Sequence, residues 1–451
     1  MSIYQACDIR GVVGQDLDLP TARQISAALG VLTTGTKVVV GGDVRLSTPE
    51  LKALLIEELV AAGCEVVDIG IVPTPVLYFA MKRLRAENGI MITASHNPAA
   101  YNGFKMVLGP SPVTEECVQK VAQLAREGAR VKGSGSCLAY DIREEYLATL
   151  AAKTKPGALK IVLDAANGAC SLWAPALFRR LGYEVIELFC QPDGRFPHHQ
   201  PNPALAENLR QLGEVVREHK ADLGIGFDGD GDRVGCVDEQ GRAVDNDQII
   251  VLFARHLLQK TKGTIVYDAK CSMVVAEETA KLGGKAVMAR AGHTFAKAAF
   301  QREQALFAGE ISGHFFFRDL GHDDGMFGGL KLAEYLSDRR QPLSVLLADI
   351  PVYPLTPDIR IPYHGGDKQA VLAAAARKLA DYTLNCIDGV RLEFADGWGM
   401  IRASVTEPLF TFRFEARTEK RLQEIAGLLL AALPAQLAAQ VAEKLAARSR
   451  K

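Results

Sequence analysis

Three aspartates alternate with glycines in FDGDGDR, residues 227–233, directly after an apolar run. They are Asp228, Asp230 and Asp232. Three carboxylates held this close repel one another unless a hard cation neutralises them, and the glycines permit a tight loop. The pattern predicts a metal site that prefers Mg²⁺, because a compact octahedral site leaves positions open for water or phosphate oxygens. The plainer interpretation is a solvated acidic turn.

A calcium-binding hand is a third interpretation of this loop, since Glu239 is the twelfth residue counted from Asp228. Two features count against it. Position six is Arg233, where a calcium hand needs glycine, and the segment before the loop is a predicted strand instead of a helix. The loop is therefore expected to hold magnesium.

A serine ends another apolar run in ITASHNP, residues 92–98, where Ser95 is followed by His96 and Asn97. Serine near proline is more commonly a turn or cap residue. The motif is not GxSxG and no triad accompanies it, which disfavours an acyl-transfer hydrolase. Beside a divalent cation, however, a serine hydroxyl can carry a phosphoryl group. Lys105, shortly after it in YNGFK, would supply a second positive partner.

Two further loops carry groups that suit a sugar phosphate, although each alone is an ordinary polar loop. GEISGH, residues 309–314, places hydrogen-bonding groups between glycines, and they are Glu310, Ser312 and His314. RASVTEP, residues 402–408, combines a guanidinium with hydroxyls that can face one phosphate, on Arg402, Ser404 and Thr406. Arg10 and His293, the latter in GHTFAK, are candidates of the same rank.

A repeated plan positions these loops. Residues 36–45, 159–168 and 263–272 are short apolar runs that close on an aspartate, namely Asp43, Asp164 and Asp268. Each run leads into a helix-like stretch, a glycine and a second apolar run, which predicts a strand, helix, strand unit used three times. Continuous apolar strands that alternate with helices predict largely parallel sheets covered on both faces. Ligands should then bind at the strand ends.

The pattern changes after Pro351 to short alternating runs and a final helix, which predicts an α+β domain with an antiparallel sheet. The fold class is therefore three similar α/β domains with mixed, largely parallel sheets plus this C-terminal domain. Gly-, Ser- and Pro-rich stretches predict the boundaries. The predicted domains are residues 1–138, 139–245, 246–353 and 354–451.

Composition bounds the partners. Lys plus Arg number 52 against 53 for Asp plus Glu, so the net charge of -1 predicts neither nucleic acid nor an anionic membrane as partner. Nine scattered cysteines and a start without a signal-like apolar stretch favour a cytoplasmic protein. The longest apolar run, residues 425–441, is broken by Pro434 and is expected to be a terminal amphipathic helix, not a membrane span.

Taken together and in order, TASHNP, DGDGDR, GEISGH and RASVTEP resemble the motifs of the α-D-phosphohexomutase family, particularly its bacterial phosphomannomutase/phosphoglucomutase branch. The resemblance spans nearly the whole chain. It implies four domains around a central cleft, the fourth able to rotate and close over substrate. It also implies that Ser95 is carried phosphorylated and that one Mg²⁺ per chain is held by Ser95 and the three aspartates.

The resemblance further implies an enzyme, an intramolecular phosphotransferase that interconverts hexose 6-phosphate and hexose 1-phosphate. A hexose 1,6-bisphosphate would be both intermediate and activator. Arg10, Lys105 and His293 would handle protons and stabilise charge. The sugar would be bound by Arg233, Glu310, Ser312 and His314, and the phosphate that does not react by Arg402, Ser404 and Thr406. The partners would be small-molecule hexose phosphates, with the chain a monomer or weak homo-oligomer.

Three positions depart from the family pattern: Cys7 replaces a common tyrosine, Val405 replaces glycine or asparagine, and Ile311 stands where methionine or glutamine is usual. Ile311 favours mannose or glucose over glucosamine. Two alternatives remain open. One is a phosphoglucosamine mutase, and the other is a catalytically silent sugar-phosphate-binding protein on the same scaffold.

Overall fold

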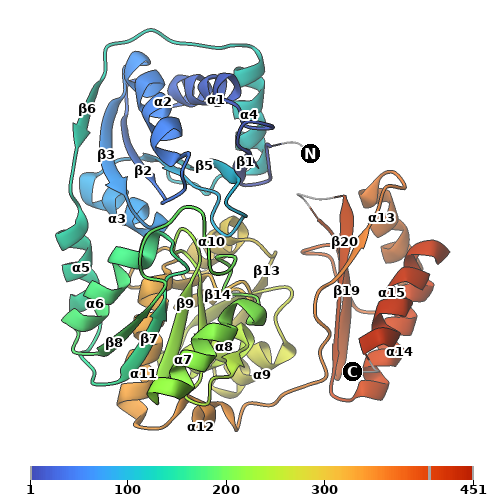
Figure 1. The fold of residues 1–451 in the computed structure, drawn as a ribbon. Coiled ribbons are helices and arrows are strands. Elements are labelled where there is room, and N and C mark those ends of the chain that lie inside the picture. Colours follow the sequence, from blue (N-terminus) through green and yellow to red (C-terminus); the bar gives the residue numbers. More distant parts are fainter. Residues whose placement is uncertain (1–2, 405–407, 449–451) are drawn as a thin grey trace.

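The computed structural model describes residues 3–404 and 408–448, and these form four β-sheets flanked by helices (Figure 1). We call the units built on these sheets domains I to IV, in chain order. The first three sheets mix parallel and antiparallel strand pairs, and the fourth is antiparallel throughout. The predicted fold class is confirmed.

Domain I contains a six-stranded sheet of order β1-β5-β4-β2-β3-β6. Its strands are β1 (Asp8–Val12), β2 (Lys37–Gly42), β3 (Glu65–Ile71), β4 (Asn88–Ile92), β5 (Tyr101–Leu108) and β6 (Ser136–Ala139). Its helices are α1 (Leu19–Leu32), α2 (Thr48–Ala61), α3 (Thr74–Leu84) and α4 (Glu115–Arg126). Successive residues of β2 face opposite sides, because Val38 and Val40 pack with α1, α2 and α4 whereas Val39 packs with α3.

Domains II and III have sheets of order β11-β10-β9-β7-β8 and β13-β12-β14-β15. Domain II comprises α5 (Arg143–Ala152), β7 (Lys160–Asp164), η1 (Ala169–Leu172), α6 (Ala174–Arg180), β8 (Glu184–Leu188), η2 (Ala206–Leu209), α7 (Arg210–His219), β9 (Leu223–Phe227), β10 (Val234–Val237) and β11 (Ala243–Val244). Domain III comprises α8 (Asn246–Leu258), β12 (Thr264–Asp268), α9 (Met273–Lys281), β13 (Lys285–Ala289), α10 (His293–Arg302), β14 (Phe307–Gly309), β15 (Phe315–Phe317), α11 (Gly325–Arg339) and α12 (Leu343–Leu347).

The aspartates that close the three repeated strands form the same local turn. The Oδ1 atoms of Asp43, Asp164 and Asp268 each accept the backbone N–H two residues on, at 2.9, 2.8 and 2.7 Å. All three side chains are buried. An aspartate that bonds its own backbone in this way ends the strand and turns the chain. The repeat seen in the sequence is therefore a structural repeat at the strand ends.

Domain IV lies beside domain III and is reached through one extended segment after α12 (Figure 1). It comprises β16 (Ile359–Pro362), α13 (Lys368–Lys378), β17 (Leu384–Asn385), β18 (Val390–Phe394), β19 (Gly397–Ala403), β20 (Leu409–Ala416), α14 (Glu419–Ala431) and α15 (Ala435–Arg448). Along β20, Phe410, Phe412 and Phe414 enter the domain core. The alternate residue Glu415 instead accepts the backbone N–H of Met273, in domain III.

Domains I to III share an apolar core, whereas domain IV has a separate one. One apolar cluster runs through domains I, II and III and includes Val39, Phe178 and Phe253. Domain IV has a core of its own, and a small cluster around Trp398 joins it to domain III. Domains I to III are thus built as one body, while domain IV is attached through a smaller apolar contact and polar bonds.

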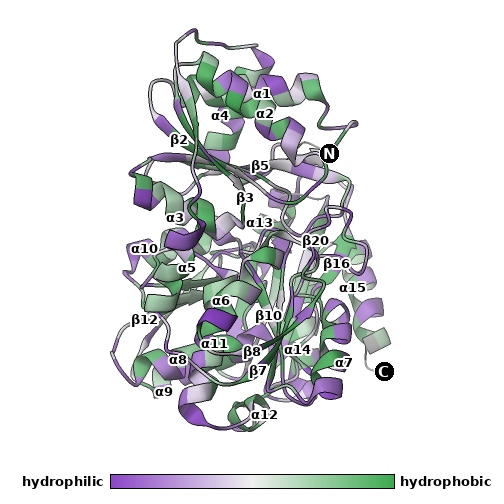
Figure 2. Cartoon of the chain, turned by 60° about the vertical axis from the view of Figure 1, so that its left-hand side comes forward, coloured by the Kyte–Doolittle hydropathy of each residue, from purple (hydrophilic) through white to green (hydrophobic). Residues whose placement is uncertain are grey.

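The C-terminal apolar run differs from the prediction. Instead of one helix there are two, α14 and α15, with Pro434 just before the first residue of α15. Proline lacks an N–H and is tolerated at a helix start but not within it. Both hydrophobic and hydrophilic residues are visible along these helices (Figure 2). Within residues 3–404 and 408–448, no helix is long and apolar enough to cross a membrane.

Candidate active site

Ser95 and the acidic loop meet at the junction of domains I and II. Ser95 follows β4, and Asp228 follows β9. The Ser95 hydroxyl donates a hydrogen bond of 2.7 Å to Asp228 Oδ2, although the two residues are 133 positions apart. Both side chains are buried. The ends of strands from two different sheets therefore bring together the hydroxyl and the carboxylate that the sequence predicted separately.

Ser95 adopts a backbone conformation that is rare for a residue with a side chain, with φ 49°. Its N–H donates to Thr93 Oγ1 at 2.9 Å, and its hydroxyl also lies 3.2 Å from His96 Nδ1. Gly229 passes close to this backbone, because a Cβ at position 229 would lie 2.5 Å from the Ser95 carbonyl oxygen. Glycine in the acidic loop is thus required for the contact with the serine loop.

The three aspartates form a set of ligand atoms. One carboxylate oxygen from each of Asp228, Asp230 and Asp232 lies within 4.8 Å of the others, and all three side chains are fully buried. Asp230 Oδ1 and Asp232 Oδ1 have no hydrogen-bond partner within the described residues. Buried carboxylate oxygens without partners are costly, and an all-oxygen set is what Mg²⁺ prefers. The residues present therefore fit a hard divalent cation.

The pKa shifts of the three aspartates also favour a bound cation. Burial and the carboxylates of Asp230 and Asp232 raise the pKa of Asp228 well above its ordinary value. Burial opposes ionisation of Asp232 too, but Lys105 and His314 outweigh it and hold the pKa of Asp232 well below its ordinary value. The pKa of Asp230 is also lowered, because Lys105 and Thr74 outweigh burial and Asp232. Two ionised carboxylates beside one ammonium leave a negative charge that a cation would neutralise.

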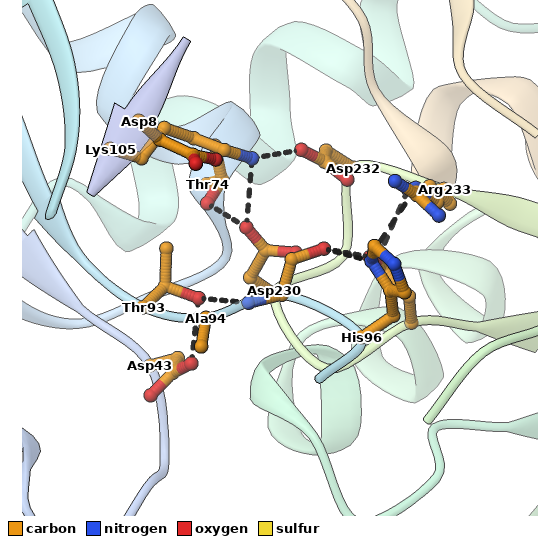
Figure 3. A network of polar contacts seen from close by, with 12 residues as sticks. Asp8, Asp43, Thr74, Thr93, Ala94, His96, Lys105, Asp230, Asp232 and Arg233 are labelled. Carbon is orange, nitrogen blue, oxygen red and sulfur yellow. Dashed lines mark hydrogen bonds and ion pairs between the residues drawn. The ribbon is translucent and has the colours of Figure 1, made fainter. Parts of the chain in front are cut away.

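Lys105, on β5, points into this cluster (Figure 3). Its Nζ forms an ion pair of 3.0 Å with Asp230 Oδ2 and a second ion pair with Asp232 Oδ2. Burial works to lower the pKa of Lys105, but the two aspartates outweigh it and raise that pKa well above its ordinary value. Thr74, at the start of α3, donates to Asp230 Oδ2 at 2.6 Å. Lys105 is therefore a fixed positive charge in the site.

Arg10, on β1, contacts the serine loop from the other side. Its Nη1 donates to Asn97 Oδ1 at 2.7 Å and to the Ala94 carbonyl at 3.2 Å. Its Nη2 forms an ion pair of 2.6 Å with Asp8 Oδ2. Arg10 thus lies beside the loop of Ser95 and places a guanidinium there.

Arg233 and His314 connect the acidic loop, residues 227–233, to domain III. Arg233 Nε donates to His314 Nε2 at 2.9 Å, and His314 Nδ1 lies 2.8 Å from Asp323 Oδ2. His293 stacks on His314 with ring centroids 5.5 Å apart. Burial, followed by the charge of Lys105, lowers the pKa of His293 to about 3.

The GEISGH loop faces the start of α10. Glu310 Oε1 accepts the Gly292 N–H at 2.6 Å, and the Ser312 hydroxyl lies 3.4 Å from Glu310 Oε2. Burial raises the pKa of Glu310. Cys7 lies at the same helix, with its sulfur 2.6 Å from Thr294 Oγ1. The unusual cysteine therefore bridges domains I and III next to this loop.

Arg402, at the end of β19, lies where domain IV meets domain III. Its Nε is 3.0 Å from Asp388 Oδ2, an oxygen that also accepts the Ala291 N–H at 3.2 Å. Within the described residues, no hydrogen bond or ion pair joins Arg402 to the loops of Ser95 and Asp228. The Ser404 N–H bonds the Leu409 carbonyl at 3.0 Å. Thr406 and Val405 lie outside the described residues.

Several polar residues of the site were not predicted from the sequence. They are Thr74, Thr93, Arg45, Asp8, Asn97 and Asp323. Asp43, which was noted only as the end of a repeated strand, accepts the Thr93 hydroxyl at 2.7 Å and the Arg45 Nε at 3.1 Å. The sequence did contain a signal for Asp43, because an aspartate at the end of a buried strand needs a polar or charged partner.

A serine hydroxyl held against a buried acidic loop, with fixed positive charges around it, is an arrangement suited to phosphoryl transfer, and here it lies in a four-domain chain. Four family models match the chain. Three are the alpha/beta/alpha domains I, II and III of phosphoglucomutase/phosphomannomutase, over residues 2–132, 144–241 and 245–353. The fourth is the C-terminal domain of phosphoglucomutase/phosphomannomutase, over residues 359–432. The chain therefore belongs to the phosphoglucomutase/phosphomannomutase family.

Individual relatives match nearly the whole chain. A phosphomannomutase/phosphoglucomutase of Pseudomonas aeruginosa is 40% identical over 435 residues, which are 94% of each chain. A phosphoglucomutase of Neisseria gonorrhoeae is 37% identical over 436 residues, covering 94% of this chain and 95% of the relative. A solved phosphoglucomutase/phosphomannomutase family protein from Burkholderia thailandensis superposes with a TM-score of 0.88 at 38% identity, covering 95% of this chain and 97% of the other.

Proposed function

We propose that this chain is a phosphohexomutase that interconverts hexose 6-phosphate and hexose 1-phosphate, with mannose, glucose or both as the sugar. The observation that carries the proposal is the contact of 2.7 Å between the Ser95 hydroxyl and Asp228, inside a buried set of three carboxylates. A hydroxyl in that position is suited to carry a phosphoryl group. Family membership and the mutase names of the relatives support the same function.

In the proposed reaction, Ser95 begins phosphorylated. The free hydroxyl of a hexose monophosphate attacks the phosphorus, the bond between phosphorus and Ser95 Oγ breaks, and a hexose 1,6-bisphosphate forms. The hydroxyl loses its proton, and Ser95 Oγ regains one. The bisphosphate then turns around and returns its other phosphate to Ser95 by the same step in reverse. Free bisphosphate would also rephosphorylate an enzyme that had lost its phosphate.

The proposed roles in this reaction fall on different residues. Asp228, Asp230, Asp232 and Ser95 are the proposed ligands of one Mg²⁺, which when bound offsets negative charge on the phosphoryl oxygens. Lys105 supplies fixed positive charge at the aspartates, and Arg10 supplies it beside the loop of Ser95. The pKa of His293 is lowered to about 3, so its ring is neutral and only weakly basic near pH 7; we propose that it hydrogen-bonds the reacting groups as a neutral imidazole.

The remaining predicted residues would bind substrate. Arg233 bonds His314, and Ser312 lies beside Glu310; we propose that these four polar side chains bind the sugar hydroxyls. Arg402, Ser404 and Thr406 are proposed to hold the phosphate that does not react. Because Arg402 now pairs with Asp388, its engagement requires that domain IV or the Arg402 side chain move toward the substrate. Closure of domain IV would also exclude water from the phosphoserine.

Assays with the 1-phosphates of mannose, glucose and glucosamine test the proposal, using Mg²⁺ and a hexose 1,6-bisphosphate activator. We expect turnover of mannose or glucose phosphate and loss of turnover in Ser95→Ala. Dominant turnover of the glucosamine phosphate would assign the amino sugar instead. No turnover of any of the three would favour a silent sugar-phosphate-binding protein.

A further inference from the structure

Arg45 is a buried arginine that the reaction described above does not use. It follows β2 and is 1% exposed. Arginine carries five side-chain N–H donors, and here all of them are engaged. Nε donates to Asp43 Oδ2 at 3.1 Å. Nη1 and Nη2 donate to four backbone carbonyls, those of Pro98, Tyr101, Ser95 and Asn97.

Those four carbonyls belong to one segment, the loop that presents Ser95. The bond from Arg45 Nη2 to the Ser95 carbonyl is 2.8 Å long, and the bond to the Asn97 carbonyl is 2.6 Å long. A positive φ at a serine is strained and persists only where surrounding contacts over-determine it. One planar guanidinium that bonds the carbonyls on both sides of His96 supplies such contacts.

Asp43 extends this set of contacts to the serine backbone. Its Oδ2 accepts the Thr93 hydroxyl at 2.7 Å, and Thr93 Oγ1 in turn accepts the Ser95 N–H at 2.9 Å. Thr48 also donates to Asp43, through Oγ1 to Oδ1 at 2.9 Å. Both polar groups of the Ser95 backbone are therefore fixed, the carbonyl by Arg45 and the N–H through Thr93.

Domain II covers the outer side of Arg45. The Phe196 ring lies over the guanidinium, with 5.0 Å between Arg45 Cζ and the ring centroid. Gly194 allows this approach, because a Cβ there would lie 2.4 Å from the Val44 carbonyl oxygen. The guanidinium is thus shielded from water, which strengthens its hydrogen bonds to the loop.

We propose that Arg45 is the positioning residue of the serine loop: its five donors and Asp43 hold the Ser95 backbone so that the hydroxyl faces Asp228. Arg45 touches neither substrate nor the metal ligand oxygens, and it acts through the backbone of residues 95–101. This inference rests on the proposed function, because a phosphorylated Ser95 is what the loop positions. The expected consequence is a loss in the rate of phosphoryl transfer rather than in substrate binding.

The test uses Arg45→Lys, which keeps the charge but cannot bond four carbonyls and Asp43 together. The rate of Ser95 phosphorylation by glucose 1,6-bisphosphate is followed by intact mass and normalised to folded protein. We expect a decrease of about 10- to 100-fold, the scale of a small misplacement of a reacting group. KM for the hexose monophosphate should stay within about twofold, because uniform binding is not removed. The control is Arg23→Lys, a partly exposed arginine of the same domain that pairs with Glu57 at 3.0 Å and with Glu58 at 2.7 Å.

If Arg45→Lys does not fold, the Thr93→Val variant tests the proposal instead. It is nearly isosteric and removes only the hydroxyl that links Asp43 to the Ser95 N–H. Slower phosphorylation in Thr93→Val with unchanged KM would support the proposal, and Thr93→Ser should restore the rate. Wild-type rates in the folded variants, or a change confined to KM, would overturn it. A wild-type chain that is never phosphorylated at Ser95 would overturn the proposed function itself and this role with it.

Discussion

Replacing Lys105 should destabilise the protein, because the buried aspartates of the acidic loop lose their positively charged partner. Lys105 is 4% exposed and pairs with Asp230 and Asp232, both fully buried. In Lys105→Met the stem is retained and the ammonium is lost, so two carboxylates remain buried without their partner. Removal of one partner of a buried ion pair costs about 3 to 5 kcal/mol. We therefore expect the free energy of unfolding in EDTA to fall by about that amount.

A divalent cation should recover much of this loss if the aspartates are its ligands. A ligand present at about 100 times its dissociation constant stabilises the folded state by about 2.7 kcal/mol. Mg²⁺ should therefore stabilise Lys105→Met more than the wild type, in which the ammonium already neutralises part of the charge. Mutase turnover should stay low even with Mg²⁺, because the fixed charge beside Ser95 is missing.

Urea unfolding followed by circular dichroism, in EDTA and in Mg²⁺, measures both effects. Lys52→Met is the matched control, because Lys52 pairs with Asp68 at 2.7 Å in the same domain but outside the cluster. Its loss should cost less than the loss of Lys105, because this pair is less buried, and it should not depend on Mg²⁺. Equal unfolding midpoints for Lys105→Met in EDTA and in Mg²⁺ would refute the assignment of these aspartates to a cation.

Three further changes test other parts of the protein. Gly229→Ala places a Cβ 2.5 Å from the Ser95 carbonyl, so turnover should fall at least about 10-fold while the fold survives by circular dichroism; wild-type turnover would contradict the close approach. Arg402→Ala should raise KM for the hexose monophosphate about 10- to 100-fold, the scale of a lost charged hydrogen bond, while Arg377→Ala on α13 should not; an unchanged KM would remove Arg402 from the phosphate site. The third change tests a buried acid outside this site, Asp324, the residue just before α11. Burial raises the pKa of Asp324 to about 7, so the folded state binds this proton more tightly than the unfolded state does, and stability should fall as pH rises from about 4 through 7. Asp324→Asn should lack that decrease, at most about 4 kcal/mol, in melting curves taken across this pH range, and a parallel pH dependence in both proteins would contradict the assignment.

The parts of the site that the sequence predicted are local. Asp228, Asp230 and Asp232 lie within five residues, and the glycines between them indicate a tight loop. Ser95 was found because it ends a strand beside His96 and Asn97. The four-domain fold followed from a repeated apolar pattern and from the change of that pattern after Pro351. In each case the signal lies in neighbouring residues.

The parts that were missed depend on pairing over long distances. Thr74 bonds Asp230, which is 156 residues away, and no local pattern distinguishes Thr74 from another helix-start threonine. Asp323 orients His314 from a separate turn, and Arg45 gains its role only from the path of the loop 95–101 around it. Likewise, the two C-terminal helices were merged because the apolar pattern continues on both sides of Pro434.

The measurement that tests the central claim most directly is peptide mass spectrometry of the protein after incubation with ³²P-labelled glucose 1,6-bisphosphate and Mg²⁺, followed by a chase with unlabelled hexose monophosphate. The account predicts one phosphate on the peptide that contains Ser95, and its transfer to the sugar during the chase at the rate of turnover. A label on another residue, or full turnover by Ser95→Ala, would contradict it.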